Sequence, residues 1–124
     1  MVDVDEKDLR HYTVLLEGLG YAVLPFTNYA EAECCLEHER IDFIIASQGG
    51  PAFEGRQFVE RTLACNRRMP VAVLTRCLDM GCYLEAMQLG AVDYLEKPLG
   101  PAEVERLVTT HALPRRYKLP TQPV

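Results

Sequence analysis

Two hydrophobic periodicities alternate along this chain, one typical of buried strands and the other of helices. Runs dominated by apolar residues, such as 42–46 and 71–75, predict strands that are buried on both faces. In other segments apolar residues recur every three or four positions, as with Leu9, Tyr12 and Leu16, and predict helices. Regular alternation of strands and helices is typical of a parallel α/β sheet covered by helices.

Capping and stop residues set the boundaries of these elements. Gly20 and Gly90 end two helices, Asn28 caps another, and Pro101 opens the last one. The predicted helices cover about residues 8–19, 28–37 and 56–64, the segment around 83–89, and the segment from 101 onward. The predicted strands are 21–26, 42–46, 71–75 and 92–95, preceded by a first strand within residues 1–4. That first strand is short, so either it is abbreviated or a few native residues are missing from this chain.

Composition and charge fit one globular domain without a basic or membrane-spanning surface. The chain has 124 residues, 48% apolar and 25% charged, and a formal net charge of −5. A net negative charge argues against nucleic-acid binding by this domain, and no apolar stretch approaches the roughly 18 residues of a membrane span. We expect a cytoplasmic domain over residues 1–112. Residues 113–124, with three prolines and a basic cluster, are expected to form a tail or linker.

Five cysteines occur without the spacing of a zinc site. Cys34 and Cys35 are adjacent, and Cys77 and Cys82 are separated more widely than zinc knuckles use. Reduced thiols that pack as small apolar groups are the expected state, and a redox or metal role is the alternative.

Polar residues gather where the predicted strands end, which is where parallel sheets carry their functional groups. Asp3 and Asp5, then Ser47, Thr75 and Lys97 fall at these ends. Their order and spacing resemble the receiver domain of two-component response regulators, over Asp3 to about His111. The motifs that carry the resemblance are Leu74-Thr75, Gly90-Ala-Val-Asp-Tyr-Leu-Glu-Lys-Pro98 and Asp42-Phe-Ile-Ile-Ala-Ser-Gln-Gly-Gly-Pro-Ala-Phe-Glu-Gly55.

The resemblance implies a flavodoxin-like (CheY-like) fold: a doubly wound, five-stranded parallel sheet in the order 2-1-3-4-5, with five helices. In that family an acidic pair on the first strand and an aspartate on the third hold Mg²⁺, and this aspartate accepts a phosphoryl group. A lysine pairs with this aspartate, and a threonine and an aromatic residue relay the structural change that phosphorylation causes. Thr75, Lys97 and Tyr94 match those last three positions.

The phosphoacceptor position does not match, because it falls on Ser47. The acidic pair is also incomplete: one alignment places Asp3 and Val4 there, and another places Val4 and Asp5. Gly49 remains compatible with the backbone ligand that the family offers to the metal. Two carboxylates about 4–5 Å apart repel by about 3–4 kcal/mol at an effective dielectric near 20. Losing two acids relieves this repulsion but removes the anchorage of the metal, so we expect weak or absent Mg²⁺ binding.

Arg76 follows the threonine, where receivers usually have a small residue. It either covers the pocket, adding positive charge to that of Lys97, or points to solvent. Ser47 lacks a neighbouring base in the sequence pattern, so a neutral, hydrogen-bonded role is expected.

These features favour a non-enzymatic pseudo-receiver of a bacterial phosphorelay that works through protein contacts without aspartyl phosphorylation. The expected contact surface is the fourth helix, last strand and fifth helix, and its candidate residues are Tyr83, Met87, Tyr94 and Leu99. Expected partners are a histidine kinase, an effector domain or a second copy. The alternatives are a small-anion or redox sensor, using the emptied pocket or the cysteines, and a conventional phospho-accepting receiver.

Overall fold

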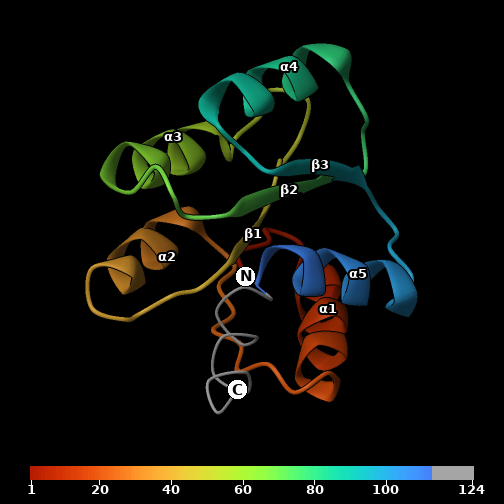
Figure 1. The fold of residues 1–124 in the computed structure, drawn as a ribbon. Coiled ribbons are helices and arrows are strands. Elements are labelled where there is room, and N and C mark those ends of the chain that lie inside the picture. The colour runs from red at the N-terminus through yellow and green to blue at the C-terminus, as the bar shows by residue number, and fades with distance from the viewer. Residues whose placement is uncertain (113–124) are drawn as a thin grey trace, which may run out of the picture.

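Helices and strands alternate through the described part of the chain, residues 1–112, in a computed structural model (Figure 1). The five helices are α1 (Glu6–Gly18), α2 (Tyr29–Leu36), α3 (Arg56–Cys65), α4 (Met80–Leu89) and α5 (Pro101–His111). The three strands are β1 (Ile44–Ser47), β2 (Val71–Thr75) and β3 (Asp93–Glu96). All five predicted helices are therefore present, within a few residues of their expected bounds.

The sheet is parallel, with β2 between β1 and β3. The prediction of five strands is not confirmed in the described residues, because the first two expected strands are present only as single-residue bridges. Val2 bridges Phe26 on one side and Ala46 on the other. Pro25 has no N–H to donate, so regular pairing of residues 21–26 is interrupted next to Phe26. The order of these bridges is the one a five-stranded sheet would have, although the five strands themselves are not formed.

Side-chain caps explain where the helices begin. The Asp5 carboxylate accepts hydrogen bonds from the backbone N–H groups of Lys7 and Asp8, so α1 begins two residues before the predicted start. Asn28 accepts from Glu31 N at 2.8 Å and begins α2. At the end of α4, Gly90 adopts the left-handed conformation, with φ of 109°, that ends many helices.

Two hydrophobic clusters lie on opposite faces of the sheet, and the alternation within each strand separates them. In β1, Ile44 and Ala46 face the α2–α3–α4 side, whereas Ile45 faces α1 and α5. Figure 1 shows this arrangement, with α1 and α5 together and the other three helices across the sheet. Such double coverage requires strands that are apolar on both faces, and β1 and β2 are buried throughout.

The tail predicted over residues 113–124 lies outside the described residues. Within residues 1–112, no helix is both long and apolar enough to cross a bilayer. The cytoplasmic location stays a prediction.

Candidate functional site

The predicted polar residues come together at the carboxyl ends of the strands. Ser47 and Thr75 end β1 and β2, and Lys97 follows the last residue of β3. Asp3 follows the Val2 bridge beside β1. All four residues are buried, and Asp3 and Thr75 are each only 1% exposed. The Lys97–Pro98 peptide bond is cis.

Four charged side chains are joined by ion pairs at this edge of the sheet, and we call them the ion cluster: Asp3, Lys97, Asp8 and Arg76. The Lys97 Nζ atom donates to Asp3 Oδ2 at 2.6 Å and to Asp8 Oδ2 at 2.9 Å. The Arg76 guanidinium donates to both oxygens of Asp8, through Nε at 3.0 Å and through a terminal nitrogen. Two carboxylates are thus balanced by two cations.

The charges in the ion cluster stabilise one another against burial. Burial by itself would raise the pKa of Asp8, but hydrogen bonds and charge from Arg76 and Lys97 outweigh it and lower that pKa. Burial by itself would lower the pKa of Lys97, but Asp3 and Asp8 outweigh it and raise that pKa. Both groups therefore stay charged at neutral pH.

Arg76 was predicted either to cover the pocket or to point to solvent, and it does part of each. Its side chain is 58% exposed, yet its guanidinium is held on Asp8 at the edge of the ion cluster. The cluster is not a free cationic pocket, because each cation already has a carboxylate partner.

The Ser47 hydroxyl is enclosed by neutral partners. Its Oγ atom lies 3.0 Å from the Tyr29 hydroxyl and 3.4 Å from the backbone N–H of Val4, which donates to it. The same Tyr29 hydroxyl donates to the Ser47 carbonyl at 2.7 Å. Gly55 packs closely against the same carbonyl, since a Cβ there would stand 2.5 Å from the Ser47 carbonyl oxygen. Only glycine fits this approach without a shift of the backbone.

Of the acidic candidates, Asp3 lies in the ion cluster and Asp5 does not. The Asp5 carboxylate caps α1 instead, where it accepts from the backbone N–H groups of Lys7 and Asp8. Val4 is half exposed, and its backbone N–H rather than a carboxylate faces Ser47. Gly49 lies in the loop after β1 with φ of 90°, and a Cβ at this position would come within 2.7 Å of the Glu54 carboxylate.

Two of the four predicted contact residues belong to the interior. Tyr94 is 7% exposed and Leu99 is 4% exposed, so their assignment to a contact surface is wrong. The Leu99 backbone N–H is bound by the Tyr12 hydroxyl at 3.0 Å, which draws this segment inward. Tyr83 and Met87, on α4, are exposed as expected. Thr75 uses its hydroxyl oxygen locally, to accept from the backbone N–H of Cys77 at 2.9 Å.

The described residues do not fit the Mg²⁺ that the family resemblance implies. No group of three His, Cys, Asp or Glu side chains within residues 1–112 is arranged to hold a metal ion. The two carboxylates at the site already share the Lys97 ammonium, which stands between them. A hard dication needs several oxygen ligands, and here the ammonium has taken two of them.

Sequence reasoning missed three residues of the site: Asp8, Tyr29 and Gln48. Asp8 was assigned to the helix start, although an acidic residue three positions after the capping Asp5 is a recognisable first-turn pattern. From the first turn of α1 its carboxylate contacts Lys97 and Arg76. Tyr29 and Gln48 left no comparable pattern, since their roles depend on tertiary contacts.

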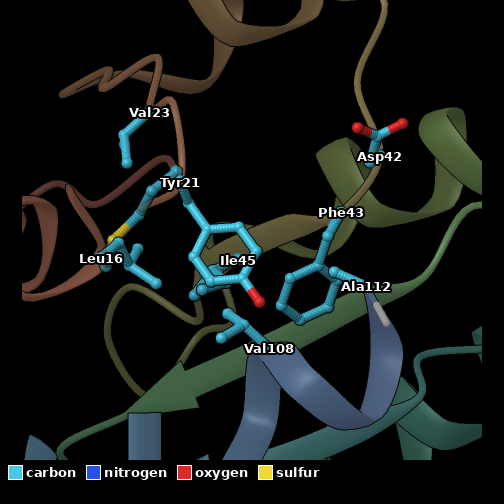
Figure 2. A pocket seen from close by; sticks show the side chains of 9 residues that line it. Leu16, Tyr21, Val23, Asp42, Phe43, Ile45, Val108 and Ala112 are labelled. Carbon is cyan, nitrogen blue, oxygen red and sulfur yellow. The ribbon is translucent and has the colours of Figure 1, made fainter. Parts of the chain in front are cut away.

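A separate cavity lies at the opposite ends of the strands, between α1, α5 and the start of β1 (Figure 2). Its volume is about 120 Å³, and Leu16, Phe43, Ile45 and Val108 give it an apolar lining. That volume is below the roughly 300–1,000 Å³ of ordinary ligand sites. We interpret it as a gap in packing rather than as a binding site.

All five cysteines are free thiols, and their environments differ. Cys82 is buried in the core, as expected of a small apolar group, and burial together with nearby Asp79 raises its pKa to about 11. Cys34, Cys65 and Cys77 are exposed.

Comparisons with known proteins agree with the fold. The sequence-family model described as response regulator receiver domain matches residues 1–109 of the chain. The regulatory protein VanRc of Enterococcus gallinarum is 31% identical over 92% of this chain and 48% of its own length. A receiver domain from Clostridium thermocellum superposes with a TM-score of 0.81 at 26% identity, covering 95% of this chain and 94% of that one. A CheY-like receiver from Methanospirillum hungatei gives a TM-score of 0.85 at 20% identity, covering 94% of each chain.

The match extends over nearly the whole chain but not over the whole of its longer relatives. The chain spans less than half of the length of several curated proteins that it matches. The matching region includes β1, β2, β3 and every member of the ion cluster. The chain therefore belongs to the response regulator receiver domain family.

Proposed function

We propose that this receiver domain passes its signal through protein contacts, without phosphorylation of an aspartate. Receiver domains are signalling modules rather than enzymes, and they interact with histidine kinases and effector domains. The observation that carries the proposal is the Ser47 hydroxyl at the end of β1, which is held by Tyr29 and Val4. The family resemblance places the phosphoacceptor at this residue. No carboxylate is present there to attack a phosphoryl group.

The chemistry around Ser47 also argues against phosphorylation of the serine. A serine hydroxyl becomes a nucleophile when a neighbouring base removes its proton. Its two hydrogen-bonding neighbours are a phenol and a backbone N–H. Burial raises the pKa of Tyr29 above its ordinary value, so this phenol is neutral at physiological pH and cannot act as the base.

The ion cluster supports the second part of the proposal, which is that Mg²⁺ binding is weak or absent at millimolar metal. A metal would have to displace the Lys97 ammonium from Asp3 and Asp8. The side chains of Lys97 and Asp3 are 4% and 1% exposed, so neither can move into solvent without opening the domain. The same pairing disfavours a small-anion sensor, since the cations are already neutralised.

The exposed face of α4 is the contact surface that we propose. Met80, Tyr83, Leu84 and Met87 recur at helical spacing on one side of this helix and are 36–70% exposed. An apolar stripe of this kind on a soluble domain marks an interaction site more often than an isolated apolar residue does. We propose that it receives a protein partner, namely a kinase, an effector domain or a second copy.

Incubation with acetyl phosphate and Mg²⁺ tests the phosphorylation claim. We expect no mass increase for the wild-type chain, and none for Ser47→Ala, which removes the hydroxyl as a matched control. A phosphoryl adduct on the wild-type chain would overturn the proposal. A base-labile adduct that persists in Ser47→Ala would lie on a carboxylate, and a base-stable adduct that is absent from Ser47→Ala would lie on the serine.

A second pair of variants tests the contact surface. Leu84→Glu places a charge in the α4 stripe, and Val14→Glu places the same charge at an exposed position on α1. In sedimentation equilibrium, Leu84→Glu should weaken any complex that the wild-type chain forms, and Val14→Glu should not. Equal binding by the two variants would exclude this face.

A further inference from the structure

Gln48, the residue after Ser47, has a buried side chain whose two ends are both bound. The side chain is 0% exposed, and its Nε2 atom donates to the Gly50 carbonyl at 3.0 Å. Its Oε1 atom accepts a hydrogen bond from the Tyr94 hydroxyl on β3. The backbone of Gln48 is held as well, because its N–H donates to the Leu74 carbonyl of β2 at 2.7 Å. The amide is therefore fixed between the end of β1 and the neighbouring strands.

Tyr94 connects this amide to the surface of α4. Its ring is buried and meets the ring of Tyr83 edge to face, with centroids 5.7 Å apart and an interplanar angle of 72°. Tyr83 is 40% exposed and belongs to the apolar stripe of α4. An unbroken line of contacts thus runs from the strand end to the proposed contact surface.

The Gln48 amide oxygen depends on the Tyr94 hydroxyl as its donor, and that hydroxyl also lies beside the Thr75 side chain and the Asp79 backbone. A buried amide oxygen without a donor is destabilising, and so is a buried phenol without an acceptor. Burial raises the pKa of Tyr94, which keeps its hydroxyl protonated and able to donate. With Gln48 in place, the inward position of Tyr94 satisfies both groups at once, whereas rotation of the ring toward solvent would leave the Gln48 oxygen unpaired.

We propose that Gln48 is a positioning residue that holds Tyr94 inside the domain and so sets Tyr83 on the contact face of α4. The bond comes from the chain itself and involves no member of the ion cluster. This inference rests on the proposed function in one respect, namely that the α4 stripe is the contact surface. It adds that the arrangement of this surface is fixed internally, by the residue beside the altered phosphoacceptor position.

Fluorine NMR of the full chain labelled with fluorotyrosine tests the proposal. Loss of a resonance in Tyr94→Phe and in Tyr83→Phe identifies the two signals. Gln48→Leu removes the hydrogen bonds with little change in size, and Gln57→Leu makes the same replacement at an exposed position of α3. We expect Gln48→Leu to shift or broaden the Tyr94 and Tyr83 resonances and to leave Tyr12, on the other face of the sheet, in place. Gln57→Leu should change none of them.

Unchanged Tyr94 and Tyr83 resonances in Gln48→Leu would overturn the proposal. If Gln48→Leu does not fold, Tyr94→Phe tests the same link more mildly, since it keeps the ring and removes the hydroxyl. A Tyr83 resonance that shifts in Tyr94→Phe supports the link, and one that stays in place refutes it.

Failure of this inference can be told apart from failure of the proposed function. The NMR experiment uses neither phosphate nor metal, and the acetyl phosphate experiment does not depend on Tyr94. An adduct on Ser47 together with shifted tyrosines would refute phosphorylation-independent signalling and keep the role of Gln48. Unchanged tyrosine resonances without an adduct would refute the role of Gln48 and keep phosphorylation-independent signalling.

Discussion

Replacing Lys97 by Met removes the cation that two carboxylates share while keeping most of the side-chain volume. The Lys97 side chain is 4% exposed, and its ammonium lies 2.6 Å from Asp3 and 2.9 Å from Asp8. In the variant Asp8 keeps Arg76. Asp3, with its side chain 1% exposed, keeps only the hydrogen bond from the Asp5 backbone N–H at 2.9 Å among its described contacts.

The magnitude follows from leaving a buried charge without its partner. Breaking a buried ion pair from one side costs about 3–5 kcal/mol of unfolding free energy. A domain of this size is stable by about 5–15 kcal/mol, so the variant should lose a large share of its stability. Removing both charges, in Asp3→Asn with Lys97→Met, should restore much of the loss because no uncompensated carboxylate remains.

The pH dependence of the loss gives a second signature. In the wild type the raised pKa of Lys97 means that its contribution is complete below about pH 10 and is lost as pH rises through the folded value. The lowered pKa of Asp8 means that its contribution is complete above about pH 4 and is lost as pH falls through the folded value. The cluster therefore contributes evenly across neutral pH. Lys97→Met lacks this contribution at every pH, so its deficit relative to the wild type should shrink as pH rises above about 10.

Urea unfolding at pH 7 and above pH 10 measures both effects, with Lys7→Met as the control because Lys7 is exposed on α1. Added Mg²⁺ should stabilise Lys97→Met more than the wild type, since the ammonium between the two carboxylates is gone. A loss below about 1 kcal/mol, the value of an exposed ion pair, would refute the account of the ion cluster. A loss that is equal at the two pH values would refute it as well.

Three further predictions concern residues around the site. Gly55→Ala should cost about 1–3 kcal/mol in urea unfolding, because its Cβ would stand 2.5 Å from the Ser47 carbonyl oxygen; an unchanged midpoint would contradict this contact. Tyr12→Phe leaves the backbone N–H of Leu99 without its acceptor and should cost about 1–3 kcal/mol, whereas full stability would show that the bond does not matter. With a pKa of about 11, Cys82 has roughly one thiolate in a thousand at pH 8, so iodoacetamide should label it last, as mass mapping of the modified peptides would show.

The part of the fold that could be predicted from sequence is the part that local patterns specify. Helical periodicity and capping residues located all five helices, and apolar runs located β1, β2 and β3. The first two strands were predicted as full strands because residues 21–26 have a strand-like composition. Their pairing depends on which backbone groups face one another, and only Val2 and Phe26 meet with the required geometry. A pattern of apolar residues carries no information about that register.

The candidate site also has one part that could be predicted from the sequence and one part that could not. Spacing within a known motif placed Ser47, Thr75 and Lys97 at adjacent strand ends. The ion cluster could not be predicted as a unit, because Asp8 meets Lys97 across 89 positions of sequence and Arg76 across 68. Tyr94 was placed on the surface by its motif, yet its bond to Gln48 holds it inside.

Under the proposed function, the ion cluster also limits where an input can act. A ligand shifts a conformational equilibrium only through a difference in its affinity for the two states. A pocket whose carboxylates and cations already satisfy one another offers little such difference to a metal or a phosphoryl group, because either would first have to break Lys97 from Asp3 and Asp8. Binding at the α4 stripe breaks no ion pair of this kind, because its side chains are exposed and bury apolar area when a partner binds. The availability of that partner, rather than occupancy of the pocket, would then control the output of this domain.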